Sequence, residues 1–204
     1  PKEINILLSH YHWDHIVGFF AFAPLYYKEY TINIFGYNKA TSISMLNDTL
    51  INKNFWPVDK EQYNAAINFI EIPKSTNEIN FIKINQTKIF YSLHPHPNGT
   101  NSFRVENNNK KITYITDCEH PLGSLNQNVV NIAKDSDILI HDAHFTINDL
   151  TKFKGWGHSS WKQAVDVAIT SNSKALVLFH YCPEYNDKQI QENETNAKKK
   201  FVNT

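Results

Sequence analysis

The chain has 204 residues, with 20 basic and 20 acidic side chains and a formal net charge of zero. This length suits one domain with a sizeable core, and the balanced charge excludes the broad basic surface with which proteins bind duplex nucleic acid. The longest apolar stretch, residues 18–27, falls well short of the roughly 20 residues that span a membrane. Two cysteines are too few for a disulfide scaffold, and no secretion signal is recognisable, so we expect a cytoplasmic location.

Short apolar runs alternate with helical patterns along the chain, which is typical of a layered α/β domain. Runs rich in β-forming residues predict strands at 4–8, 31–35, 81–84, 88–93, 102–106, 112–115, 138–140 and 175–179. The asparagines at 107–109 separate two of these runs and predict a hairpin turn. Ser159 and Ser160 predict the N-cap of a helix that begins at Trp161. The polar stretch 187–204 carries one weak apolar stripe and predicts a last, solvated helix.

The densest chemical motif is His-Tyr-His-Trp-Asp-His at residues 10–15, directly after the first predicted strand. Residues two apart in an extended segment point the same way, so His10 and His12 can bind one metal ion. Asp14 and His15 are adjacent and follow the turn, where they can face a second ion. Three imidazoles and a carboxylate within six residues therefore predict a metal site.

Further candidate ligands stand at the ends of later predicted strands. They are His94, His96, Asp117 and His180. Loops at one edge of a sheet converge on a rigid scaffold, so we expect these side chains to lie close together. Spacing alone does not decide between His94 and His96.

The segments SHYHWDHIVG, HPNGTNSFR, ITDCE, LIHDAHF, GWGHSS and LFHYCP, spread over about residues 3–183, resemble the metallo-β-lactamase fold hydrolases. The resemblance is to the phosphodiesterase branch, which includes ribonuclease Z and the cyclic-phosphate phosphodiesterases. It implies one α/β domain over residues 1–204, an αββα sandwich with two metal ions at one edge of its sheets. Full-length relatives carry several strands before the histidine motif. We therefore expect this chain to lack the first strands of the fold and to be N-terminally incomplete.

The resemblance also implies a ligand set. It assigns His10, His12 and His96 to a first ion. It assigns Asp14, His15 and His180 to a second ion, and Asp117 would bridge both. The ligand histidine of the family precedes an aromatic–Arg pair by the spacing that separates His96 from Phe103 and Arg104, which favours His96 over His94. Imidazole-rich sets completed by oxygen suit two Zn²⁺ ions, with Mn²⁺ or Fe²⁺ as alternatives.

Catalytic roles follow from the same resemblance. His158 occupies the position in GWGHSS at which phosphodiesterase members carry a histidine that protonates the leaving oxygen. Asp142 would hold His158 in the required tautomer, and Asp14 would steer the proton of the attacking water. Two divalent ions can lower the pKa of water toward about 7 and neutralise the charge on a phosphoryl group. His141 and His144 have structural as well as functional interpretations.

Three side chains near these positions favour structural roles. Cys118 and Cys182 each follow a proposed ligand, and neighbours in extended backbone point to opposite sides, so both thiols are expected to face an apolar layer. Arg104, the only arginine, could contact a substrate phosphate, but its place inside a predicted strand favours a structural ion pair at least as much.

The function implied is that of a binuclear metal-dependent phosphodiesterase. Its expected substrate is a small cyclic or linear phosphodiester, because residues 16–93 hold no basic insertion like the arm with which ribonuclease Z recruits tRNA. The alternatives are a tRNA 3′ endonuclease, an ester or lactone hydrolase on the same metal site, and a metal-binding remnant without activity. A nucleic-acid partner is less favoured and no membrane partner is expected. A homodimer would cover the sheet edge that missing strands expose.

Overall fold

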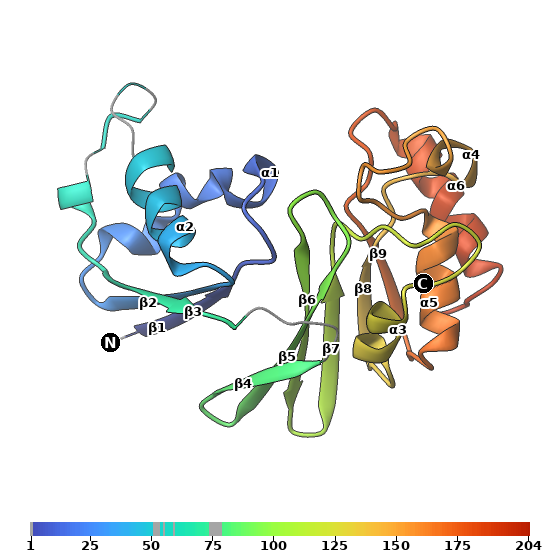
Figure 1. Ribbon diagram of the computed structural model, residues 1–204, viewed down its shortest axis with the longest axis horizontal. Coiled ribbons are helices and arrows are strands. Elements are labelled where there is room, and N and C mark those ends of the chain that lie inside the picture. The colour runs from blue at the N-terminus through green and yellow to red at the C-terminus, as the bar shows by residue number, and fades with distance from the viewer. Residues whose placement is uncertain (1, 51–53, 55, 59, 74–78) are drawn as a thin grey trace. The chain divides into compact units, whose positions relative to one another are not determined.

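The computed structural model describes the chain except for residues 1, 51–53, 55, 59 and 74–78. The chain forms two compact units, residues 1–74 and 75–204, and each contains one β-sheet with helices packed on it (Figure 1). The combination of a β-sheet and packed helices in each unit agrees with the predicted α/β class. Among the described residues, no helix combines the length and the apolar character needed to cross a bilayer.

The first unit has a parallel three-stranded sheet, in the order β1 (Lys2–Leu7), β2 (Tyr30–Gly36) and β3 (Ala66–Glu71). Parallel pairing requires crossover connections, and these form short helices on one face of the sheet (Figure 1). The connections contain α1 (Trp13–Ile16), the 3₁₀ helices η1 (Val17–Ala21), η2 (Ala23–Tyr26) and η4 (Lys60–Gln62), α2 (Lys39–Ser44) and the π-helix η3 (Met45–Leu50). Strand β3 was missed by the sequence analysis because exposed residues alternate with half-buried ones along it, so its apolar pattern is weak.

The second unit has a mixed six-stranded sheet whose strands follow the chain order. They are β4 (Asn80–Ile84), β5 (Thr87–His94), β6 (Thr100–Asn107), β7 (Lys110–Ile115), β8 (Ile138–Asp142) and β9 (Leu176–Phe179). Pairing is antiparallel from β4 to β7 and parallel from β7 to β9. Each of these strands was predicted. The expected hairpin joins β6 and β7 through Asn108 and Asn109, both at positive φ, as a type I′ turn requires.

Helices of the second unit are α3 (Gln127–Ala133), α4 (Ile147–Leu150), α5 (Trp161–Thr170) and α6 (Asp187–Lys198). The predicted N-cap of α5 is confirmed, because the Ser160 side chain accepts from the Gln163 N–H and the Gln163 side chain bonds back to complete a capping box. Trp161 and Val165 of this helix are buried against β-strand residues such as Leu139 in the main core cluster. The predicted solvated C-terminal helix corresponds to α6.

Polar side chains collect at one edge of the six-stranded sheet. Strands β5, β7, β8 and β9 run in the same direction, so their carboxyl ends lie together. His94 ends β5 and Asp142 ends β8, while Asp117 and His180 follow β7 and β9. The sheet therefore brings together residues that are up to 86 positions apart in the chain.

Candidate metal centre

The histidine motif lies in the first unit, where it begins after β1 and continues into α1. His10 is only 2% exposed, and its ring centroid lies 4.5 Å from that of His12 and 4.3 Å from that of His15. Ser9 Oγ bonds His10 Nδ1 at 3.1 Å, and Asp14 Oδ2 lies 3.1 Å from His15 Nε2. This one short segment thus gathers three imidazoles and a carboxylate.

Asp117 is the centre of the ligand candidates in the second unit. Its Oδ1 lies 3.6 Å from His96 Nε2, and its Oδ2 lies 3.6 Å from His180 Nε2. These distances are too long for hydrogen bonds. Two ligands that each lie about 2.1 Å from one tetrahedral ion are roughly 3.4 Å apart. Each carboxylate oxygen is thus spaced from a different imidazole as co-ligands are, so these residues fit a divalent ion on either side of Asp117.

Two of these candidate ligands have unusual backbone conformations. Asp117 and His180 lie in the left-handed region, with φ of 51° and 61°. The other described non-glycine residues with positive φ are asparagines and aspartates, and histidine is enriched in this region together with these two residue types. Left-handed conformations of non-glycine residues cost on the order of 1–3 kcal/mol each and cluster at functional sites.

Asp142 and His158 form the predicted pair. His158 Nδ1–H donates to Asp142 Oδ2 at 3.0 Å, and the same oxygen accepts from the Cys118 N–H at 3.2 Å. Asp142 Oδ1 accepts from the N–H groups of His144 and Ser159 at 2.9 and 3.2 Å. Four donors therefore fix the buried carboxylate, and the carboxylate fixes the tautomer of His158. His158 Nδ1 also lies 3.9 Å from Asp117 Oδ1.

His144 belongs to the same group of rings. Its ring is stacked on that of His158, with 4.2 Å between the centroids, and its Nδ1–H donates to the His180 carbonyl at 2.9 Å. Burial lowers the pKa of His144, and the neighbouring His158 lowers it further to a smaller extent. In the sequence, His144 was noted only as part of the run from His141 to His144, which left open whether its role is structural or functional.

A second cluster of buried side chains contains Cys118, His120 and His141, which are close enough to hold an ion. The tautomers of the two histidines argue against a metal. His120 Nδ1 accepts from the Asn126 N–H at 3.0 Å, so its Nε2 carries the ring proton, whereas His141 Nδ1–H donates to the Asp142 carbonyl at 2.8 Å and leaves Nε2 as an acceptor. A protonated Nε2 has no lone pair to offer a metal ion, so His120 is a poor ligand in this arrangement.

The imidazole of His120 is buried in its neutral form, so we expect the folded protein to lose stability in acid. Burial, with His141 and His94 nearby, lowers its pKa to about 3, against about 6.5 in an unfolded chain. Between these two pKa values, His120 is protonated in the unfolded chain but neutral in the folded protein. The stability that depends on neutral His120 is therefore complete above about pH 6.5. It falls by roughly 1.4 kcal/mol per pH unit as the pH drops toward 3.

Urea unfolding of metal-free protein between pH 7 and 5 measures this effect. We expect His120→Asn, whose Oδ1 can replace Nδ1 as acceptor, to be less stable at pH 7 but to lose less stability on acidification. An equal pH dependence in the variant and the wild-type protein would show that His120 is not held neutral.

Arg104 and Cys118 have the structural roles that the sequence allowed. Arg104 Nε lies 2.8 Å from Glu106 Oε1, its Nη1 donates to the Ile132 carbonyl at 3.0 Å, and its guanidinium stacks over Phe90. Cys118 is fully buried in the core cluster, where burial raises the pKa of its thiol.

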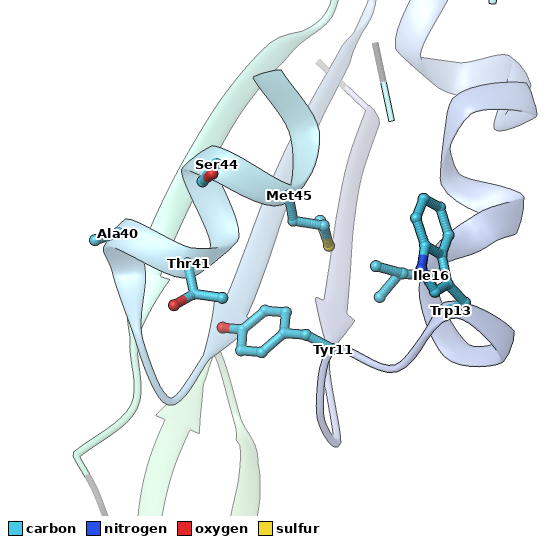
Figure 2. A pocket seen from close by; sticks show the side chains of 7 residues that line it. All are labelled: Tyr11, Trp13, Ile16, Ala40, Thr41, Ser44 and Met45. Carbon is cyan, nitrogen blue, oxygen red and sulfur yellow. The ribbon is translucent and has the colours of Figure 1, made fainter. Parts of the chain in front are cut away.

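A pocket of about 450 Å³ lies beside the histidine motif in the first unit (Figure 2). It is lined by Tyr11, Trp13, Ile16, Ala40, Thr41, Ser44 and Met45. The Tyr11 hydroxyl donates to the Asn38 carbonyl at 3.0 Å, which holds its ring toward α2, whereas the Trp13 side chain is 60% exposed. Tyr11 and Trp13, which alternate with the candidate ligands, thus both line this pocket.

Comparison with known proteins decides the family. The family described as "Beta-lactamase superfamily domain" matches residues 2–181. The chain belongs to this family. Ribonuclease Z of Bacillus cereus (strain G9842) is 34% identical over 73 residues, which are 36% of this chain and 24% of that protein. Ribonuclease Z of Picrophilus torridus is 35% identical over 69 residues, which are 34% of this chain and 22% of that protein. The matches thus span about a quarter of the length of these relatives.

Solved structures agree with this assignment. The metallo-β-lactamase fold protein YhfI from Bacillus subtilis has a TM-score of 0.69 at 18% identity and covers 97% of this chain and 70% of its own. Human tRNase Z, short form, has a TM-score of 0.67 at 20% identity and covers 88% of this chain and 73% of its own. The expected metallo-β-lactamase fold is confirmed.

Proposed function

We propose that the chain is a metal-dependent hydrolase that cleaves a small cyclic or linear phosphodiester. The observation that carries this proposal is the hydrogen-bonded pair of Asp142 and His158. The Nδ1 atom of His158 also lies 3.9 Å from Asp117 Oδ1. An alkoxide leaves slowly without a proton, so cleavage of a phosphodiester with an alcohol leaving group is accelerated by a general acid near the metal centre. The ribonuclease Z relatives support the same class of reaction.

The proposed metal ligands are those that the family resemblance implies. They are His10, His12 and His96 for one ion, Asp14, His15 and His180 for the other, and Asp117 between them. The spacing around Asp117 supports its bridging role, and the imidazole content of the set suits zinc, with Mn²⁺ or Fe²⁺ as alternatives. When bound, two divalent ions would make an activated water available near neutral pH and neutralise charge on the phosphoryl oxygens.

Three side chains of this chain would move or hold protons. Asp14, whose side chain is 63% exposed, would orient the proton of the attacking water. His158 would give its Nε2 proton to the departing alkoxide, because its Nδ1–H is held by Asp142. The buried charge of Asp142 would stabilise the positively charged imidazole before this transfer.

A small substrate is favoured by the pocket beside the histidine motif. Its volume of about 450 Å³ suits a planar group such as a nucleobase, and the exposed indole of Trp13 offers a stacking surface. The identity to ribonuclease Z favours a second candidate function, cleavage at the 3′ end of tRNA precursors. The balanced charge of the chain argues against this substrate. A cytoplasmic location and a homodimer stay predictions.

Replacing His158 by alanine tests the proposed general acid on two substrates. We expect the kcat of zinc- or manganese-loaded protein for 2′,3′-cyclic AMP to fall by about 10²–10⁴-fold. Hydrolysis of bis(p-nitrophenyl) phosphate should fall much less, because p-nitrophenolate leaves without a proton. Trp156→Ala is the matched control, since this exposed side chain lies in the same loop.

Equal losses on both substrates would show that His158 is structural rather than an acid. Cleavage of precursor tRNA without cleavage of cyclic nucleotides would establish the second candidate function. Ester or lactone hydrolysis that is unaffected by His158→Ala would replace the phosphodiesterase proposal. Two bound ions without turnover on any of these substrates would indicate an inactive remnant.

A further inference from the structure

The loop between α4 and α5 presents His158, and it contains two glycines in conformations that other residues rarely adopt. Gly155 and Gly157 have φ of 89° and 87°. Glu119 lies against this loop, and both of its carboxylate oxygens accept from the Gly155 N–H at 3.0 Å. Its Oε2 also accepts from the Gly157 N–H at 2.8 Å. Converging backbone N–H groups form a concave anion site, which here holds a side-chain carboxylate.

The same glycine contacts a candidate metal ligand through its carbonyl group. His96 Nδ1–H donates to the Gly157 carbonyl at 3.0 Å, which sets the tautomer of His96 and leaves Nε2 on the side of Asp117. A Cβ at position 157 would lie 2.1 Å from His96 Nδ1, so the close approach requires glycine. Gly157 is therefore held through its N–H by Glu119 and through its carbonyl by His96.

Glu119 is also tied to the metal centre through the backbone. It lies two residues after Asp117, and its N–H donates to the Pro95 carbonyl, next to His96, at 3.3 Å. The segment that supplies the candidate bridging carboxylate therefore also supplies the anchor of the loop. Glu119 is half-buried, and its hydrogen bonds to the glycine N–H groups fix its carboxylate.

We propose that Glu119 is a positioning residue, which clamps the loop at 155–158 so that His96 and His158 are both correctly oriented. Its effect on catalysis rests on the proposed function, whereas its effects on the loop and on metal affinity do not. Loss of the clamp would free the backbone at Gly157, whose carbonyl accepts the hydrogen bond that orients His96.

The test compares Glu119→Gln and Glu119→Asp with Glu192→Gln, an exposed position on α6. An amide offers one acceptor oxygen and an NH₂ group that opposes the glycine N–H groups, so Gln keeps the size but not the clamp. In metal-free Glu119→Gln we expect faster hydrogen exchange and shifted NMR signals for the Gly155 and Gly157 N–H groups. Zinc affinity, measured by chelator competition, should fall about 10–100-fold. Glu119→Asp keeps the charge and should show smaller effects.

With cyclic nucleotide, we expect kcat to fall in Glu119→Gln while KM changes little. Unchanged glycine signals and unchanged zinc affinity would overturn the clamp. A lower melting temperature with unchanged zinc affinity and kcat would overturn it as well, since it would show a structural role only. If wild-type protein cleaves no phosphodiester, the proposed function fails, and the glycine signals and zinc affinity still decide the role of Glu119.

Discussion

Asp117→Asn should abolish binding of at least one metal ion while leaving the fold intact. The two oxygens of Asp117 face His96 Nε2 and His180 Nε2 at 3.6 Å, and the Thr116 hydroxyl donates to Oδ2. Asparagine keeps the shape but removes the charge and turns one acceptor into a donor. Changes to residues that merely orient metal ligands cost about 10–100-fold in affinity. We therefore expect zinc affinity to fall by more than about 100-fold, measured by calorimetry and metal analysis, and turnover to fall with it.

Asp137→Asn is the matched control for this change. Asp137 precedes β8, at the opposite end of that strand from Asp142, and its carboxylate accepts from the Lys111 N–H and from Lys174 Nζ. It should lower stability slightly and leave the metal content unchanged. Two tightly bound ions in Asp117→Asn would contradict a bridging role for this carboxylate.

Gly157→Ala should disrupt the metal centre from outside the ligand set. The added Cβ would lie 2.1 Å from His96 Nδ1 and 2.6 Å from Pro97 Cδ, and φ at this position is 87°. Both neighbours are ring atoms, so the imidazole of His96 or the loop must move. A displacement of about 1 Å at a catalytic group can cost about 10²-fold in rate. We expect a loss of this size in kcat, together with weaker zinc binding.

Gly155→Ala separates the steric effect from backbone strain. Gly155 has nearly the same φ, 89°, but a Cβ there would meet no atom within 4 Å. Both variants should lose about 1 kcal/mol of stability from the unfavourable conformation, measured by urea unfolding. Only Gly157→Ala should lose metal affinity. Equal metal affinity in the two variants would show that contact between residue 157 and His96 is unimportant.

Much of the fold follows from local sequence. The strands of the second unit were predicted because their β-forming runs are bounded by turn residues, such as the asparagines between β6 and β7. The start of α5 was predicted because Ser160 is a strong N-cap. Strand β3 was missed because its pairing partner, β2, lies some thirty residues earlier and its own apolar pattern is weak.

The histidine motif was recognised from the sequence because its chemistry lies within six consecutive residues, whose spacing alone brings the rings together. The Asp142–His158 pair was expected only from the family resemblance, and the structure places its atoms 3.0 Å apart. Tertiary structure alone revealed the stacking of His144 on His158, which are 14 positions apart. It also revealed the bonds of Glu119 to the glycine loop, which join residues up to 38 positions apart. Sequence determines which side chains can bind a metal or carry a proton. Which atoms meet depends on how strand ends and loops converge at one edge of the sheet, a long-range property that no local pattern contains.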